Sequence, residues 1–256
     1  MTPEEADTPG TRRVYRRFLT GLGFTPWVTL TVVLFLVVVH LATGAWDVAH
    51  HRGGWLDLVI GDRSDRTLTA FGARTRWALR RHQAWRLLAY GGLHGGLLHV
   101  GMNTLALGGL GRIAESVYGG RRFLALLLLS TLGGGAASWL AGVGLSVGIS
   151  GGVFGLMGAL VAYGLWHRAA LPHALRELFG RRLAPWVLVN LALGLPLAGV
   201  VDNACHLGGL VTGAIIGPFL ADHILDNRRP SVRGDWLVLG INVGLIAWVV
   251  VGEIAR

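Results

Sequence analysis

Four polar side chains lie within apolar stretches of the sequence and are of types that perform acyl transfer. They are Ser150, His206, His99 and Asn103. A serine hydroxyl becomes a useful nucleophile when a histidine takes its proton during attack, which requires the two heavy atoms to approach within about 2.6–3.2 Å. An asparagine amide can donate a hydrogen bond to the negatively charged oxygen that then forms. The chemistry therefore depends on elements that bring these four residues together.

Taken one at a time, polar residues in apolar runs have simpler explanations. A serine in a glycine-rich helix usually contributes to helix packing, and a histidine or asparagine usually makes an interhelical hydrogen bond. His40 also lies within an apolar run but has no polar partner at a matching depth, so we expect a structural role for it. Cys205 precedes His206, but adjacent positions on a helix point about 100° apart, which argues against a nucleophilic thiol.

The composition predicts a membrane protein. Only 14% of the 256 residues are charged, against about 25% in soluble domains, and 40 are glycine, which is frequent in transmembrane helices. All 23 basic residues are arginine and are spread through the loops, whereas a nucleic-acid-binding domain gathers its charge on one soluble face, so no nucleic-acid partner is expected. The polar first 26 residues do not read as a cleavable signal peptide, and a single cysteine excludes an internal disulfide.

Seven apolar runs are candidates for membrane-spanning helices, which need about 20 mostly apolar residues each. The runs are 26–43, 93–111, 123–143, 148–166, 184–201, 204–222 and 236–252. We therefore predict an all-α fold, a polytopic membrane helix bundle. Its predicted parts are a cytoplasmic N-terminal tail (1–25), a six-helix core (26–222), and a linker with an extra C-terminal transmembrane helix (223–256).

Arginines predict the orientation, because cytoplasmic loops carry the excess of positive charge. The N-terminal tail and the loops after the second, fourth and sixth runs are rich in arginine, which places them in the cytoplasm. The absence of lysine and the short loops indicate a bacterial inner membrane. The first loop, 44–92, breaks the rule with eight arginines on the outer side. We expect this loop to lie partly in the outer leaflet, with Trp77, Trp85 and Tyr90 at the headgroups.

In this orientation the second, fourth and sixth runs all begin at the outer side of the membrane. His99 and Asn103 are four residues apart and so share a helix face. The four polar residues then lie at a similar depth, and polar groups inside a span usually face the bundle interior. Glycines predict close packing between the fourth and sixth runs. They are Gly148, Gly151, Gly152 and Gly155 in the fourth run and Gly209, Gly213 and Gly217 in the sixth.

These motifs, in this order, resemble those of the rhomboid intramembrane serine proteases over about residues 85–220. The segments that carry the resemblance are WR at 85–86, HGGLLHVGMN at 94–103, GRIAE at 111–115, GISG at 148–151 and HLGGLVTG at 206–213. The resemblance implies a rhomboid-like six-helix core, to which the seventh run adds one helix. It also implies an endopeptidase that cleaves transmembrane protein substrates near the outer face of the membrane, surrounded by lipid and without a cofactor or metal.

The resemblance assigns a catalytic role to each of the four polar residues. It implies Ser150 as the nucleophile and His206 as the general base. It implies Asn103 and His99, with the backbone N–H of Ser150, as the oxyanion hole. Asp202 precedes His206 by one turn and lies at the outer mouth of its run, so we expect a Ser–His dyad rather than a triad.

Three further residues are predicted at the substrate side of the serine. Gly148 and Gly151 let the backbone around Ser150 approach a substrate closely. The resemblance implies that Phe154 stacks on the histidine, at a position where the family often has tyrosine. It also shows Cys205 at a position where the family usually has alanine.

Two other functions remain open from the sequence. A catalytically silent rhomboid-like protein that binds membrane clients is one; it fits chains that lack the serine or the histidine, and this chain has both. A transporter is the other, but it would need internally repeated halves and broken helices, and the sequence contains no convincing repeat.

Overall fold

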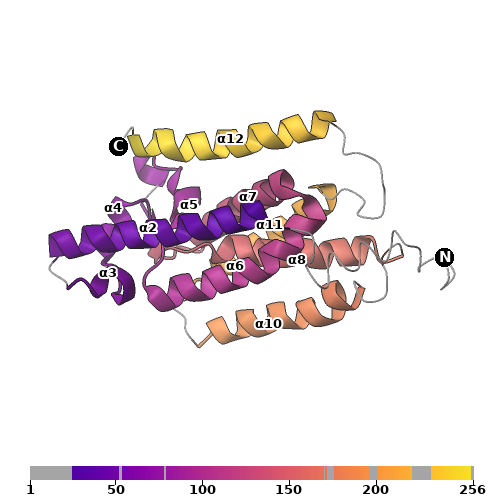
Figure 1. Ribbon diagram of the computed structural model, residues 1–256, viewed down its shortest axis with the longest axis horizontal. Helices are drawn as coiled ribbons and strands as arrows, with labels where there is room; N and C mark the ends of the chain where they lie inside the picture. Colours follow the sequence, from indigo (N-terminus) through magenta and orange to yellow (C-terminus); the bar gives the residue numbers. More distant parts are fainter. Residues whose placement is uncertain are drawn as a thin grey trace.

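The described residues of the computed structural model are 25–51, 54–77, 79–169, 171, 176–196, 201–220 and 232–254. They form a mostly helical bundle (Figure 1). The predicted N-terminal tail lies outside the described residues apart from residue 25, and so does most of the linker predicted before the last helix.

Long helices occupy the places of the apolar runs. They are α2 (Trp27–His51), α6 (Leu97–Tyr118), α7 (Gly120–Leu140), α8 (Ser150–Trp166), α10 (Leu183–Gly194), α11 (Asn203–Leu220) and α12 (Val232–Ile254). Within the described part of the chain, α2, α7 and α11 are long and apolar enough to cross a membrane. The helix α8 and residues 236–252 of α12 are also apolar but shorter. A mostly helical fold is therefore confirmed, with two short paired strands beside the helices, whereas a count of six spans plus one stays a prediction.

Some helices begin or end at residues other than those predicted, at positions where a glycine or a proline interrupts the helix. The second run was predicted at 93–111, but α6 begins at Leu97, after Gly96 in extended conformation, and continues to Tyr118. It ends at Gly119, whose φ of 75° suits glycine. The fifth run was predicted to reach residue 201, but α10 ends at Gly194, shortly before Pro196. The first helix, α2, extends past the predicted residue 43 to His51.

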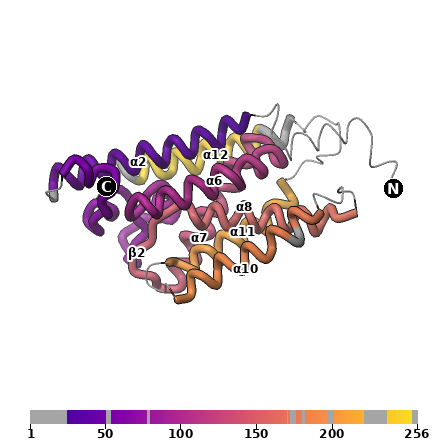
Figure 2. The backbone as a smooth tube through the Cα atoms, turned by 60° about the horizontal axis from the view of Figure 1, so that its bottom comes forward, coloured from indigo at the N-terminus to yellow at the C-terminus, as the bar shows by residue number. Residues whose placement is uncertain are grey.

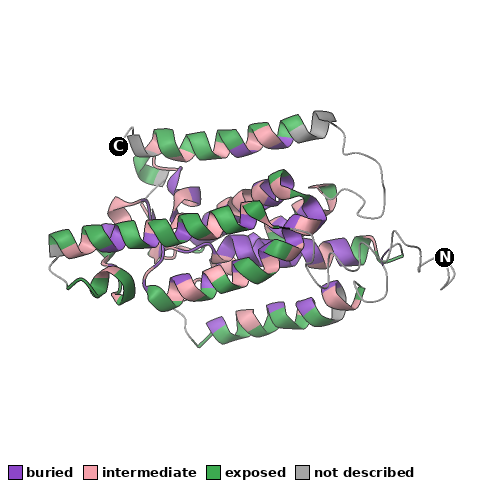
Figure 3. Cartoon of the chain, in the orientation of Figure 1, coloured by how far each residue is buried: buried purple, intermediate pink, exposed green. Residues whose placement is uncertain are grey.

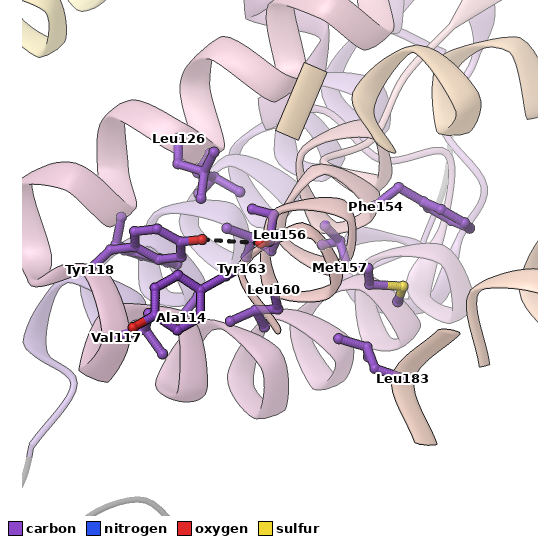
Figure 4. Packing of buried hydrophobic residues seen from close by; sticks show 14 of the residues in the cluster. Ala114, Val117, Tyr118, Leu126, Phe154, Leu156, Met157, Leu160, Tyr163 and Leu183 are labelled. Atoms are coloured by element: carbon purple, nitrogen blue, oxygen red, sulfur yellow. Dashed lines mark hydrogen bonds between the residues drawn. The ribbon is translucent and has the colours of Figure 1, made fainter. Parts of the chain in front are cut away.

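The centre of the bundle is α8. Residues 151–160 are all buried, and Figure 3 shows this helix as the purple interior behind partly exposed helices. Its side chains pack against buried residues of α6, α7 and α10 (Figure 4), and the Tyr118 hydroxyl donates to the Ala159 carbonyl. On the outside, Leu98, Leu105 and Phe219 are at least 75% exposed, as expected for a surface that faces lipid. The helix that begins with Ser150 is thus surrounded by protein.

Glycine contacts join α8 to α11. A Cβ atom on Gly209 would collide with the backbone of Gly151, and one on Gly213 would collide with the backbone of Gly155. Neither neighbour can move aside, because both are main-chain atoms. This confirms the predicted close packing of the fourth and sixth runs, in which small residues let two backbones approach.

A buried carboxylate joins α2 to α6 at the end of the bundle opposite the first loop. Glu115 is 4% exposed and accepts hydrogen bonds from the backbone N–H groups of Val28 and Thr29, at 3.1 and 2.8 Å. It also accepts one from the Thr29 hydroxyl at 2.7 Å. These bonds satisfy N–H groups of the first turn of α2, which have no partner within the helix.

Short elements make up the first loop and its partner strand. They are α3 (Asp57–Ile60), α4 (Asp65–Ala70), β1 (Arg74–Thr75), η2 (Leu79–Arg81), α5 (Arg86–Ala89), η3 (Tyr90–Gly92) and β2 (Leu145–Ser146). A further π-helical segment, η4 (Glu177–Arg182), precedes α10. The strands β1 and β2 pair antiparallel, with Arg74 opposite Ser146. Figure 2 shows β2 at the same end of the bundle as the first loop.

The first loop is packed more deeply than predicted. Three of its arginines, Arg63, Arg74 and Arg86, are buried, and each donates to backbone carbonyls. Trp85 and Tyr90 are also buried, so the prediction that they lie among lipid headgroups is wrong. The excess of arginine in this loop conflicts with the rule that positive charge gathers in cytoplasmic loops. Burial explains part of the conflict, because these three guanidinium groups hydrogen-bond to carbonyls inside the protein.

Two residues of the outer helices have structural contacts. His40 Nε2 lies 3.0 Å from the Val59 carbonyl and 3.1 Å from Arg63 Nη2, in agreement with the expected structural role. On α12, the Asn242 amide donates to the Arg121 carbonyl at 2.9 Å, so the last helix lies against α7. Figure 1 shows α12 along the edge of the bundle.

Candidate active site

Ser150 and His206 are in direct contact. The Ser150 Oγ lies 2.9 Å from His206 Nε2, although 56 residues separate them in the sequence. Ser150 is the first residue of α8, and His206 lies in the first turn of α11. Both side chains are partly buried. The distance is that of a hydrogen bond suited to proton transfer.

The segment before Ser150 is held by backbone conformation and by one hydrogen bond. Gly148 has a φ of 112°, which a residue with a side chain rarely adopts. Its N–H donates to the Tyr90 carbonyl at 3.0 Å, so the first loop anchors the chain two residues before the serine. The absence of a side chain at Gly148 also leaves room for the neighbouring helix α6.

His99 and Asn103 of α6 lie beside Gly148. A Cβ atom placed on Gly148 would be 2.7 Å from His99 Nε2 and 3.7 Å from Asn103 Nδ2. Asn103 is 7% exposed and donates one amide hydrogen to the His99 carbonyl at 3.0 Å. An amide NH₂ has two hydrogens, so one remains for another acceptor. The structure thus brings both predicted donors next to the segment that leads to Ser150.

An aromatic ring and the helix start orient His206. Phe154 stacks on the imidazole, with ring centroids 4.2 Å apart and planes inclined by 13°. His206 Nδ1 has no hydrogen-bond partner among the described residues. Among the described residues Asp202 makes no hydrogen bond to the imidazole; its carboxylate accepts from the Cys205 N–H at 3.0 Å and from the Ser138 hydroxyl. The geometry is that of a serine–histidine pair without a third carboxylate.

Gly151 and Cys205 lie on the far side of the serine. A Cβ atom on Gly151 would be 2.8 Å from Cys205 Sγ and 3.0 Å from Tyr90 Oη, so its small size serves helix packing. Cys205 is buried, with its sulfur 3.1 Å from the Tyr90 hydroxyl. Its burial agrees with the expectation that its thiol is not a nucleophile.

This arrangement can support acyl transfer. A hydroxyl next to an imidazole can attack a carbonyl carbon, and nearby amide and ring donors can hydrogen-bond to the oxygen that becomes negative. Because Phe154 and the helix packing restrict the imidazole, the pair does not have to be assembled after a substrate binds.

The sequence model of the Rhomboid domain matches residues 81–223, which is more than half of the chain. The chain belongs to the rhomboid family. Rhomboid proteins are intramembrane proteases, although some members are pseudoproteases. The match includes Asn103, His99, Ser150 and His206, and family membership together with the apolar helices makes this an integral membrane protein.

Several rhomboid proteins are similar in sequence. Rhomboid protease GluP of Bacillus subtilis is 35% identical over 158 residues, which cover 62% of this chain and 30% of that protein. RHOMBOID-like protein 2 of Arabidopsis thaliana is 38% identical over 156 residues, covering 60% of this chain and 48% of the relative. Rhomboid-like protease 3 of Toxoplasma gondii is 29% identical over 154 residues, covering 60% and 58%. The similarity therefore spans about a third to somewhat over half of each of these relatives.

Sequence reasoning missed Tyr90 as a residue that holds this candidate site. Its carbonyl holds Gly148, and its hydroxyl donates to the Thr131 carbonyl at 2.8 Å, beside Cys205. Burial raises the pKa of Tyr90, so the hydroxyl stays protonated and can donate. A tyrosine at the start of an apolar run has the same local pattern as an interfacial tyrosine, and no local signal in the sequence separates the two.

Proposed function

We propose that this rhomboid protein is a serine endopeptidase that cleaves transmembrane-helix substrates with a Ser150–His206 dyad. The observation that carries the proposal is the 2.9 Å distance between Ser150 Oγ and His206 Nε2. The name of the Bacillus subtilis relative, a rhomboid protease, supports the same reaction class. The proposal includes Asn103, His99 and the Ser150 N–H as donors to the oxyanion.

The proposed reaction has two steps that balance in protons. Ser150 Oγ attacks the substrate carbonyl carbon while His206 Nε2 takes the hydroxyl proton and then gives it to the leaving amine, which releases an acyl-enzyme. Water then attacks the acyl carbon, His206 takes a proton from this water, and the proton returns to Ser150 as the acid product leaves. A serine ester forms and breaks, and one peptide bond is hydrolysed.

The length of α8 supports a reaction below the membrane surface. Its 17 residues rise about 25 Å at 1.5 Å per residue, whereas the hydrocarbon core is about 30 Å thick. A serine at the first residue of such a helix lies beneath the surface, so water must reach it through a polar opening. In the predicted orientation this opening faces the outer side, with the N-terminus in the cytoplasm and a bacterial inner membrane as the setting. The substrate is a transmembrane helix that unwinds near its outer end.

Substrate contacts are proposed for residues beside the serine. Gly148 brings backbone next to the two proposed oxyanion donors, and Phe154 stacks on the histidine as one wall of the site. Gly151 contributes by letting α8 approach α11, so that the Ser150 N–H is presented at a rigid helix start. The surrounding partner is membrane lipid, and the reaction requires no cofactor or metal.

A fluorophosphonate probe tests the proposal directly, because it reacts with a serine only when a base activates the hydroxyl. We expect covalent labelling of the purified full-length chain in detergent, with the adduct mapped by mass spectrometry to the peptide that contains Ser150. The same preparation should cleave a model transmembrane substrate. Absence of an adduct in folded protein, or an adduct on another serine, would contradict the proposal and favour a silent, client-binding rhomboid protein.

Replacing Asn103 with alanine should lower kcat by about 10²–10³-fold, because one donor to the oxyanion is lost while the serine and histidine remain. Cleavage kinetics with a model substrate measure this loss, and KM should change little. Thr104→Ala is the matched control: among the described residues, its hydroxyl on the same helix bonds only to backbone carbonyls of its own preceding turn. Equal losses in both variants would show that Asn103 acts through helix stability instead.

A further inference from the structure

We propose that Arg74 and Asp202 are positioning residues that set the distance between Ser150 and His206, an inference that rests on the proposed protease function. The two residues form an ion pair at the first-loop end of the bundle, at 3.9 Å between Arg74 Nη2 and Asp202 Oδ2. Neither touches the serine or the imidazole by any hydrogen bond of the described residues. Their effect on the distance between the two side chains therefore passes through the segments that they hold.

Arg74 connects the first loop to the chain that leads to Ser150. Its guanidinium is fully buried and donates to the Val143 carbonyl and to the Ser138 hydroxyl, both at 2.7 Å. Its backbone pairs with Ser146 in the two-stranded sheet, four residues before Ser150. One residue thus fixes both the end of α7 and the strand from which the nucleophile segment starts.

Asp202 anchors the start of α11, the helix that carries His206. It precedes α11 directly and accepts the Cys205 N–H at 3.0 Å, which satisfies one of the free N–H groups at the helix start. Its other oxygen accepts from the Ser138 hydroxyl, which is also bonded to Arg74. Asp202 lies four residues, about one helical turn, before His206. The network of Arg74, Ser138 and Asp202 therefore ends one helical turn before His206, the proposed general base.

Burial makes this pair sensitive to loss of either charge. Arg74 has no exposed surface and the Asp202 side chain is 14% exposed, so each charge depends on the other and on the bonds around it. Removing one partner leaves an uncompensated buried charge, which moves segments until water or another group can reach it. A displacement of about 1 Å between reacting atoms can cost about 10²-fold in rate. A small shift at the start of α11 or at β2 would therefore be visible in catalysis.

The first test replaces Asp202 with asparagine, which keeps the size of the side chain and the oxygen that caps α11 but removes the charge. We expect the rate of fluorophosphonate labelling at Ser150, measured on the full-length chain in detergent, to fall about 10- to 100-fold. With a model transmembrane substrate, kcat should fall by a similar factor while KM stays within about twofold. Labelling of Asp202→Asn at the wild-type rate would overturn the inference.

A second pair of variants separates positioning from general stabilisation. Arg74→Gln alone should lower the labelling rate, because Asp202 is then left without its counter-charge. Combining Arg74→Gln with Asp202→Asn should restore much of the lost rate, because no buried charge remains unpaired. If the double variant is as slow as the product of the two single effects, the residues act independently and the proposed pair is wrong.

Glu115→Gln is the matched control at the opposite end of the bundle. It removes another buried carboxylate charge, from the bonds between α6 and the start of α2. We expect it to lower the thermal unfolding midpoint without changing the labelling rate of the folded fraction. If it slows labelling as much as Asp202→Asn, the effect is general and the inference fails. If the wild-type chain itself is not labelled at Ser150, the proposed protease function fails instead.

Discussion

The Ser150→Ala variant is expected to lose fluorophosphonate labelling and cleavage of a transmembrane substrate altogether. Alanine removes the only atom of this residue that can bond to the substrate carbonyl carbon, while α8 keeps its first residue and its packing. In serine proteases, loss of the nucleophile lowers kcat by about 10⁴-fold or more. Cleavage assays on protein that elutes as folded in size-exclusion chromatography measure the loss.

The His206→Ala variant should lose labelling and cleavage in the same way. The effects of the two substitutions on kcat should not be additive. Because Ser150 and His206 act as one unit across a 2.9 Å contact, Ser150→Ala combined with His206→Ala should be no slower than either variant alone. Ser116→Ala is the matched control, since within the described part of the chain its hydroxyl bonds only to the Ile113 carbonyl of its own helix. Residual activity in Ser150→Ala that disappears in another serine variant would sink the proposed mechanism.

The Gly209→Ala variant is expected to be severely destabilised. The new Cβ atom would overlap the backbone of Gly151 on α8, and no side chain can move to make space. Overpacking of this kind costs about 1–3 kcal/mol or more in the free energy of unfolding. The separation of α8 and α11 would also carry Ser150 away from His206. We therefore expect a lower thermal unfolding midpoint together with loss of activity in the fraction that remains folded.

Gly108→Ala is the matched control for this prediction. It also replaces a glycine within a long helix, but on α6, where a Cβ atom would meet nothing within 4 Å. Alanine is favoured over glycine in a helix by about 1 kcal/mol, so this variant should be as stable as the wild type or more stable. If Gly209→Ala unfolds at the same temperature as Gly108→Ala, the close contact of the two backbones does not contribute as we argue.

Much of the bundle could be predicted because membrane helices have a strong signal in the sequence. Apolar runs of about 20 residues located the long helices, and the arginine distribution suggested that three of them begin on the same side. Placing Ser150 and His206 near two of these starts predicted that they lie at a similar depth, and the resemblance to rhomboid proteases implied that they act as a pair. The glycine repeats predicted the packing face for the same reason, since a backbone contact requires residues without side chains.

The first loop could not be predicted in the same way. Arg74 and Tyr90 of this loop make side-chain contacts with residues between 41 and 128 positions away, and no periodic pattern marks such contacts. An arginine that binds buried carbonyls has the same sequence signal as one that faces solvent. Helix ends were also uncertain, because Gly96 and Gly119 decide them by backbone conformation rather than by polarity.

The burial of Cys205 gives the protein an internal reporter of local opening. It is the single cysteine of the chain, and its sulfur is enclosed between α11 and Tyr90 of the first loop. A thiol reagent can reach it only during a fluctuation that separates these elements. The same fluctuation would disturb the residue that follows it, His206. The rate at which a thiol reagent modifies Cys205 thus reports how often His206 is displaced from its position in the site.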